Sequence, residues 1–202
     1  MTAIFFTRHG ETQWNVLRKM QGWQDSPLTE KGRLQAVQLR ERMKTTPLTT
    51  VYSSDAPRAV TTAELICGNR DIPIVPMEGL REMGLGDWEG CSINELLKKG
   101  NESSQNFFYH PQKFVPPKGA ESFNDVRSRI AKTLSGLAKK HENESILIVA
   151  HGILMRNISA YLRKKSIEEV WSDLYKPTAL SLVIANNNDF EIEYWNDTSH
   201  YS

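Results

Sequence analysis

Two apolar segments of this chain each run directly into a histidine followed by a glycine, and this repeated feature constrains the fold more than any other. Residues 3–7 are rich in β-branched and aromatic side chains and lead toward His9. Residues 145–150 are almost continuously apolar, as a buried parallel strand is, and lead into His151. Because ligands bind at the carboxyl ends of the strands in open α/β sheets, both histidines are expected at a ligand site.

Segments with the apolar spacing of helices and of strands alternate along the rest of the sequence. Helical spacing covers residues 29–43, 57–67, 122–140 and 153–163, and short helices are predicted over 92–99 and 167–174. Strand-like segments cover residues 50–53, 72–76, 179–185 and 190–195, the last two joined by the turn 186–189. This alternation predicts an α/β protein, a three-layer α/β/α sandwich with a mostly parallel central sheet and an antiparallel edge strand.

Length and charge limit the partners that this chain can have. Its 202 residues are interpreted as one domain, 1–202, with 25 Lys and Arg against 24 Asp and Glu. The formal net charge of +1 provides no general field for nucleic acid or an anionic membrane, so neither is expected as a partner. No segment approaches membrane-spanning length and the N-terminus lacks a secretory pattern, so we expect a cytoplasmic monomer or homodimer. Cys67 and Cys91 are expected to be unpaired thiols.

Residues 100–120 are the least periodic part of the chain and contain several prolines and aromatic side chains, Phe107 and Phe114 among them. A structureless stretch of this length inside a compact domain is often functional, so a substrate-side loop or lid is predicted here. A substrate wall is expected from some of the aromatic side chains on loops beside the candidate site: Trp14, Trp23, Trp88 and those of residues 107–114. Three further histidines have no comparable context and are interpreted as surface residues: His110, His141 and His200.

Four strand ends or adjoining loops carry charged groups that together suit one phosphoryl group. Arg8 ends the first strand, Arg58 lies in the first turn of a helix, and Glu82 lies on a glycine-rich loop. Arginine forks bind phosphate oxygens bidentately and keep their charge, while a neutral imidazole such as His9 can attack phosphorus to give a phosphohistidine. His151 can donate to the phosphoryl oxygens, and a partly buried Glu82 can protonate the leaving oxygen and then activate water.

The order of these residues resembles the histidine phosphatase superfamily, also called the phosphoglycerate mutase-like family, in its broad-specificity phosphatase branch. The matching motifs follow the family's order over most of the chain: Arg8-His9-Gly10-Glu11-Thr12-x-x-Asn15, Gln21-Gly22, Leu28-Thr29-x-x-Gly32, Ser53-Ser54-Asp55 with Arg58-Ala59 and Thr62-Ala63, Leu80-x-Glu82, Gly86-x-Trp88-Glu89-Gly90, and His151-Gly152. One small departure is Ala56-Pro57, where relatives commonly have a leucine, and it concerns the local geometry of the helix.

The resemblance implies a role for each matched residue. His9 corresponds to the phosphorylated nucleophile and Glu82 to the proton donor. The phosphate pocket would consist of Arg8, Arg58 and His151. The substrate-binding residues that complete it would be Asn15, Gln21, Gly22 and Gly152. Members of the family need no metal, so we expect no cofactor and a small phosphorylated metabolite as the partner.

Three functions remain open on this evidence. The first is a phosphatase that hydrolyses small organic phosphate monoesters through a phosphohistidine on His9. The second is a cofactor-dependent phosphoglycerate mutase, which would use the same residues together with 2,3-bisphosphoglycerate. Mutases of the family generally have a longer, arginine-rich insertion before the second histidine, whereas residues 100–120 contain no arginine, which favours the phosphatase.

The third, disfavoured function is a non-catalytic domain that binds a phosphate ligand. Such a domain would be expected to lack one of the four key side chains, His9, Arg58, Glu82 or His151, and none is missing. A zinc site on the two histidines and the glutamate is also disfavoured, because two arginines beside the metal would repel it.

Overall fold

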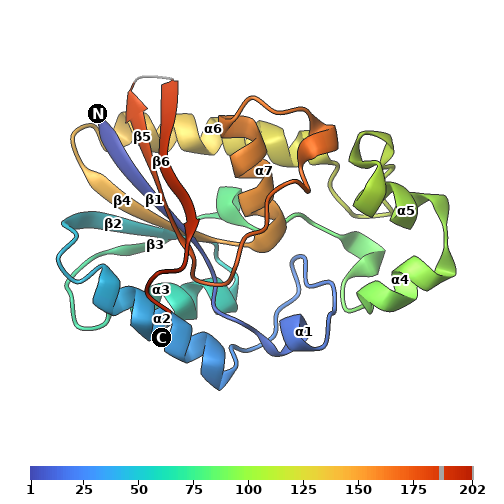
Figure 1. Cartoon of the computed structure of the whole chain (residues 1–202), viewed down its shortest axis with the longest axis horizontal. Coiled ribbons are helices and arrows are strands. Elements are labelled where there is room, and N and C mark those ends of the chain that lie inside the picture. Colours follow the sequence, from blue (N-terminus) through green and yellow to red (C-terminus); the bar gives the residue numbers. More distant parts are fainter. Residues whose placement is uncertain (187–188, 202) are drawn as a thin grey trace.

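The computed structural model describes residues 1–186 and 189–201, which are organised around one mixed sheet (Figure 1). Within these residues the sheet has six strands in the order β3-β2-β4-β1-β5-β6. The strands are β1 (Thr2–Arg8), β2 (Leu48–Ser53), β3 (Ile74–Pro76), β4 (Ser145–Ala150), β5 (Leu180–Asn186) and β6 (Asp189–Asp197). The first four are parallel to one another, and β5 is antiparallel to both β1 and β6. The predicted mostly parallel sheet with an antiparallel edge is therefore confirmed; residues 187 and 188 of the predicted turn lie outside the described residues.

Helices cover both faces of this sheet, as the predicted three-layer sandwich requires. The helices are α1 (Gln13–Val16), α2 (Glu30–Arg42), α3 (Pro57–Cys67), α4 (Ile93–Lys99), α5 (Glu102–Tyr109), α6 (Phe123–Lys140) and α7 (Gly152–Leu162). Short 3-10 turns are η1 (Glu78–Leu80), η2 (Gly86–Trp88), η3 (Pro111–Lys113) and η4 (Ile167–Glu169). Figure 1 shows α2 and α3 on one face and α6 and α7 on the other. No helix in the described part of the chain is long and apolar enough to cross a membrane.

The central strand β4 shows how its sequence forms two cores. Because successive side chains of a strand point to opposite faces, its uninterrupted apolar sequence serves both layers. Ile146 and Ile148 belong to the core under α6 and α7, whereas Leu147 and Val149 belong to the core under α2 and α3. All four side chains are fully buried. Both faces of β4 are therefore packed against a hydrophobic core along the strand that leads to His151.

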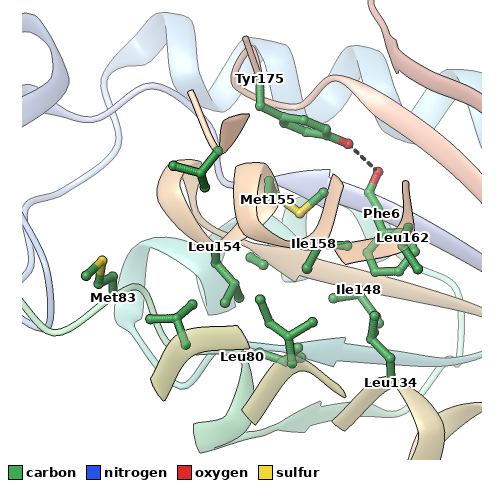
Figure 2. Close-up of a cluster of buried hydrophobic side chains, with 14 of the residues drawn as sticks. Phe6, Leu80, Met83, Leu134, Ile148, Leu154, Met155, Ile158, Leu162 and Tyr175 are labelled. Atoms are coloured by element: carbon green, nitrogen blue, oxygen red, sulfur yellow. Dashed lines mark hydrogen bonds between the residues drawn. The ribbon is translucent and has the colours of Figure 1, made fainter. Parts of the chain in front are cut away.

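The core between the sheet and α7 fixes the helix that starts at the second histidine. Phe6 and Ile148 of the sheet pack with Leu154 and Ile158 of α7 (Figure 2). Burying an aliphatic or aromatic side chain of this size contributes about 1.5–3 kcal/mol each. The hydroxyl of Tyr175 donates to the Phe6 carbonyl at 3.2 Å, which gives a polar group in this core its partner. The N-terminus of α7 is therefore rigidly placed.

Residues 100–120 are not structureless, and that part of the prediction is wrong. They contain α5 and η3, and α5 begins where the Asn101 side chain accepts a hydrogen bond from the amide of Ser104 at 2.7 Å. Phe107 is fully buried and Phe114 is 8% exposed, so both belong to the core. A helix of 8 residues has too few turns to show a clear apolar period, which is why the sequence pattern looked irregular.

Two smaller predictions also need correction. His141 is not a surface residue: it is 5% exposed, its Nε2 lies 2.8 Å from the Tyr52 hydroxyl and its Nδ1 lies 2.6 Å from Glu144 Oε2. The histidine occupies the end of α6, where the chain turns into β4 and a polar side chain can satisfy buried partners. The short helix predicted over residues 167–174 is limited to η4. A capping box between Ser166 and Glu169 begins this single turn.

Candidate active site

The two histidines predicted at strand ends lie side by side. β1 and β4 are neighbours, with Arg8 opposite Ala150 in the parallel register, and the amide of His9 donates to the Ala150 carbonyl at 2.9 Å. The imidazole rings of His9 and His151 meet edge to face with their centroids 5.3 Å apart. Both rings are buried. The shared sheet edge therefore brings together the two residues on which the sequence argument depended.

The hydrogen bonding of His9 determines which of its nitrogens can react. Nδ1 lies 2.7 Å from the carbonyl of Gly10, and because a carbonyl only accepts, Nδ1 carries the proton. Nε2 is then left with its lone pair. Burial, followed by the positive charges of Arg58 and Arg8, lowers the pKa of His9 well below 6.5. The ring is thus a neutral imidazole, the form that can act as a nucleophile.

Position 10 requires a glycine because the chain after β1 passes very close to the start of α2. A Cβ at Gly10 would lie 2.4 Å from the carbonyl oxygen of Gly32 in α2, so a side chain there would displace that helix. The amide of Gly10 also donates to Thr62 Oγ1 of α3 at 3.1 Å. The turn that presents His9 is therefore clamped against α2 and α3.

Arg58 lies in the first turn of α3 and is only 2% exposed. Its guanidinium donates to the carbonyl of Gly22 at 2.8 Å, to the carbonyl of Gln24 at 2.7 Å, and to Asp25 Oδ1 at 2.9 Å. These bonds fix the plane of the fork. The N-cap residue of α3, Ala56, has no side chain that can cap the helix, and Asp25 Oδ1 accepts the amide of Arg58 at 3.3 Å.

Several buried nitrogens around the histidines have no hydrogen-bond partner among the described residues. They are Nε of Arg8, Nε of Arg58, and both ring nitrogens of His151. Arg8 otherwise donates from Nη1 to the Tyr175 carbonyl at 3.1 Å. Since buried polar groups are normally satisfied, this cluster of unpaired nitrogens indicates a site for an anionic ligand. Burial, then the charges of Arg58, His9 and Arg8, lowers the pKa of His151 well below 6.5, so its ring is also neutral without a ligand.

Gly152 allows Arg8 to approach the start of α7. A Cβ at this position would lie 3.3 Å from Cζ and 3.4 Å from Nε of Arg8, in tight contact with the guanidinium. The glycine therefore keeps the space that Arg8 occupies beside the two histidines. This role follows from the packing and was not apparent from the motif alone.

Glu82 is placed with its carboxylate at the N-terminus of α7. Oε1 accepts from the amides of Leu154 at 2.9 Å and Met83 at 2.9 Å, and Oε2 accepts from the amide of Ile153 at 3.0 Å. Helix N-termini present unpaired amides that favour a carboxylate. The loop that carries Glu82 thus reaches the same helix that begins beside His151, and Glu82 is 8% exposed.

Two predicted substrate-binding side chains already have partners in the loop around α1. Asn15 Oδ1 accepts the amide of Thr12 at 3.1 Å, which completes a capping box. Gln21 Nε2 donates to Thr12 Oγ1 at 2.9 Å, and Gln21 Oε1 accepts from Ser26 Oγ at 3.2 Å. Both side chains line the cavity described next, so their bonds fix the shape of its wall.

A cavity of about 240 Å³ opens over these groups. All of the predicted residues line it except His151, whose ring contacts that of His9. Aromatic side chains form part of its wall: Phe107, Phe108 and Trp171. The first two belong to residues 100–120, whereas Trp14, Trp23 and Trp88 do not line the cavity. Among the described residues, no group of three or more His, Cys, Asp or Glu side chains could hold a metal ion.

Sequence reasoning missed two cations of this wall, Arg156 and Lys19. The Arg156 guanidinium lies 5.3 Å from the ring centroid of Trp171 and donates to the carbonyls of Trp171 and Asp173. Helical spacing was the available signal, because Arg156 follows Gly152 by one turn of α7 and residues four apart share a face. Lys19 lies in an irregular loop that offers no such signal.

Comparisons with known proteins identify the family of this chain. The family described as "Histidine phosphatase superfamily (branch 1)" matches residues 4–198. A metal-independent phosphoserine phosphatase of Arabidopsis thaliana is 34% identical over 204 residues, covering 100% of this chain and 84% of the relative. A probable phosphoglycerate mutase GpmB of Salmonella choleraesuis is 34% identical over 155 residues, covering 77% of this chain and 72% of the relative.

Two solved structures have nearly the same fold over almost the full length. Bacillus stearothermophilus YhfR matches with a TM-score of 0.95 and 38% identity, covering 99% of both chains. The phosphoserine phosphatase of Entamoeba histolytica, solved in complex with 3-phosphoglyceric acid, matches with a TM-score of 0.88 and 30% identity, also covering 99% of both chains. The predicted family and fold are therefore confirmed.

Proposed function

Because this chain belongs to the histidine phosphatase superfamily, we propose that it hydrolyses small organic phosphate monoesters through a phosphohistidine on His9. The observation that carries this proposal is the neutral imidazole of His9, with its proton on Nδ1 and its Nε2 lone pair free. Around it stand the unpaired donors of Arg8, Arg58 and His151. A nucleophile next to a set of preorganised phosphate donors is what phosphoryl transfer requires.

In the first step, His9 Nε2 attacks phosphorus as the ester P–O bond breaks. The departing alkoxide oxygen takes a proton from Glu82, which has to enter this step protonated, so a neutral alcohol leaves. Arg8, Arg58 and His151 donate to the three remaining phosphoryl oxygens and stabilise the charge that develops there. The bond from Nδ1 to Gly10 compensates the positive charge that the ring acquires.

In the second step, water attacks the phosphohistidine and the N–P bond breaks. The Glu82 carboxylate left by the first step takes a proton from this water, which restores the acid and the free imidazole of His9. The products are the alcohol and inorganic phosphate. No metal takes part in this scheme, and the name of the Arabidopsis relative, a metal-independent phosphatase, supports that reading.

The substrate class follows from the size and lining of the cavity. A volume of about 240 Å³ suits a small metabolite, with the phosphoryl group over His9 and the alcohol part against the aromatic wall. We assign residues 100–120 to the substrate side of a single domain, since Phe107 and Phe108 line the cavity. Related structures contain phosphoserine and 3-phosphoglyceric acid, which supports a small anionic phosphate ester. We also infer a reducing, cytoplasmic setting, because Cys67 and Cys91 are free thiols.

A panel of phosphate esters tests the proposal. Phosphate release from p-nitrophenyl phosphate, phosphoserine and 3-phosphoglycerate is measured, the last with and without 2,3-bisphosphoglycerate. We expect release that a chelator does not inhibit and that His9→Ala abolishes together with the acid-labile phosphoenzyme. The exposed His110→Ala variant is the matched control. Interconversion of phosphoglycerates faster than phosphate release would instead establish the mutase.

A further inference from the structure

Arg129 of α6 contacts the backbone of the loop that carries Glu82, at a distance of 47 residues in sequence. Its Nη1 donates to the carbonyls of Gly79 at 3.2 Å and Arg81 at 2.8 Å, and its Nη2 donates to the carbonyl of Glu82 at 3.0 Å. Three carbonyls within four residues thus receive donors from one planar group. Gly79 lies in η1, and Arg81 and Glu82 follow the end of this turn, so these carbonyls are not bonded within an α-helix or a strand.

Glu121 holds the guanidinium in place and extends the contact. Its Oε1 accepts Nε of Arg129 at 2.8 Å and its Oε2 accepts Nη2 at 2.9 Å, a bidentate pair. Oε2 also accepts the amide of Gly84 at 2.8 Å. Arg129 and Glu121 therefore form hydrogen bonds to the loop on both sides of Glu82, at Arg81 and at Gly84. Both side chains are about 20% exposed, with 20% for Arg129 and 19% for Glu121.

Apolar packing alone does not fix the direction of the Glu82 side chain. Leu80 and Met83 anchor the loop in the core on either side of it (Figure 2), and both are fully or almost fully buried. Apolar contacts are not directional, so these anchors do not by themselves orient the peptide planes between them. The bonds from Arg129 orient those planes, together with the bond from Trp23 Nε1 to the Glu82 carbonyl at 3.0 Å, while the amides of α7 hold the carboxylate itself.

From these contacts we propose that Arg129, braced by Glu121, is a positioning residue for the proton transfers of Glu82. The proposal rests on the proposed function. Without the brace, the carboxylic acid would no longer meet the leaving oxygen in the right place. Displacement of a reacting group by about 1 Å can cost on the order of 10²-fold in rate.

The test compares esters that differ in their need for a proton. The p-nitrophenolate group leaves without much help, whereas an alkoxide needs the acid. We measure kcat/KM, which reports the steps up to the phosphoenzyme, for p-nitrophenyl phosphate and for the best alkyl ester of the panel. Arg129→Lys, which keeps the charge but loses the fork, should lower the alkyl value by about 10- to 100-fold and the nitrophenyl value by less than about threefold.

Two further variants keep the outcome interpretable. Glu121→Gln should show the same selective loss, smaller in size, because the bidentate partner of Arg129 is weakened. Arg127→Met is the matched control, since Arg127 lies on the same helix and donates instead to the Lys165 carbonyl at 2.9 Å. If Arg129→Lys and Glu121→Gln lower kcat/KM equally for both esters, or do not lower it for either, Arg129 does not position Glu82 for proton transfer.

Amide hydrogen exchange separates failure of the brace from failure of the proposed function. Exchange at residues 82–85 should be faster in Arg129→Lys than in the parent chain, and Arg127→Met should leave it unchanged. A parent chain that releases no phosphate from any ester contradicts the proposed function. Unaltered exchange in Arg129→Lys contradicts the brace, whatever the activity.

Discussion

Asp25 accepts two hydrogen bonds from Arg58 through one oxygen, from the backbone amide at 3.3 Å and from Nη1 at 2.9 Å. The Arg58 side chain is 1% exposed and that of Asp25 is 26% exposed, so the pair lies at the boundary of the buried site. Asp25 thus caps α3 and orients the guanidinium at the same time. The Asp25 carboxylate therefore orients the Arg58 guanidinium in the absence of a bound phosphate.

Replacement of Asp25 should therefore weaken phosphate binding. Asp25→Asn keeps an oxygen acceptor but removes the charge that compensates Arg58, so the fork loses its fixed orientation. We expect KM for p-nitrophenyl phosphate to rise about tenfold, which corresponds to ~1.4 kcal/mol. Steady-state kinetics measure this, with Asp71→Asn at an exposed position as the control. An unchanged KM would show that the backbone carbonyls suffice to orient Arg58.

Gly152→Ala should reduce activity without reducing stability. The added Cβ would lie 3.3 Å from Arg8 Cζ and press on the guanidinium, while alanine is the better helix former at the start of α7. We expect kcat/KM to fall about tenfold or more, since small displacements of phosphate ligands are costly. Thermal unfolding and kinetics are measured together.

Gly136→Ala is the matched control for this change. Gly136 lies within α6, and a Cβ there meets no atom within 4 Å. It should raise the free energy of unfolding by about 0.5–1 kcal/mol and leave kcat/KM unchanged. Loss of stability in Gly152→Ala would mean that the packing around Arg8, and not its position alone, is disturbed.

The strand ends made the central pair of the site predictable. A buried parallel strand can be recognised from its unbroken apolar sequence, and parallel strands end on one edge of a sheet, so His9 and His151 were expected at the same edge; the pairing of β1 with β4 makes them neighbours. Arg58 was predictable for a similar reason, because it starts the helix after β2. These positions depend on local pattern and topology alone.

Contacts between distant loops and helices were not predictable in the same way. Nothing in the sequence near Arg129 indicates that its side chain contacts the Glu82 loop, because that contact depends on how α6 packs on the sheet. Arg156 was overlooked because a helix pattern does not reveal which polar residue at its edge faces a cavity. The short α5 was missed because one or two turns show no period.

The pH dependence of stability should reflect the two buried histidines. Burial lowers the pKa of both His9 and His151 well below 6.5, so the folded chain keeps them neutral while the unfolded chain protonates them. Between the folded and unfolded pKa values the unfolded state binds more protons, and the free energy of unfolding therefore falls as the pH is lowered below about 6.5. Each histidine adds at most about 1.4 kcal/mol per pH unit.

Urea unfolding between about pH 7.5 and pH 5 measures this slope. His151→Gln should make the slope shallower, because one buried proton acceptor is removed. His110→Gln, at an exposed position, should leave it as in the parent chain. A slope that His151→Gln does not alter would show that His151 takes up its proton in the folded state as readily as in the unfolded state.

Phe107 and Phe108 are adjacent in α5 but should respond differently to truncation. Phe107 is fully buried and contacts the rings of Trp88, Phe114, Phe123 and Trp171. Phe107→Ala should therefore lower the free energy of unfolding by about 3–5 kcal/mol through the cavity it leaves. Phe108 is half-buried and faces the same substrate cavity, so Phe108→Ala should cost less stability and raise KM for aromatic esters more than for phosphoserine. Denaturant unfolding and the ester panel measure the two effects, and equal KM changes for aromatic and aliphatic esters would remove Phe108 from the substrate wall.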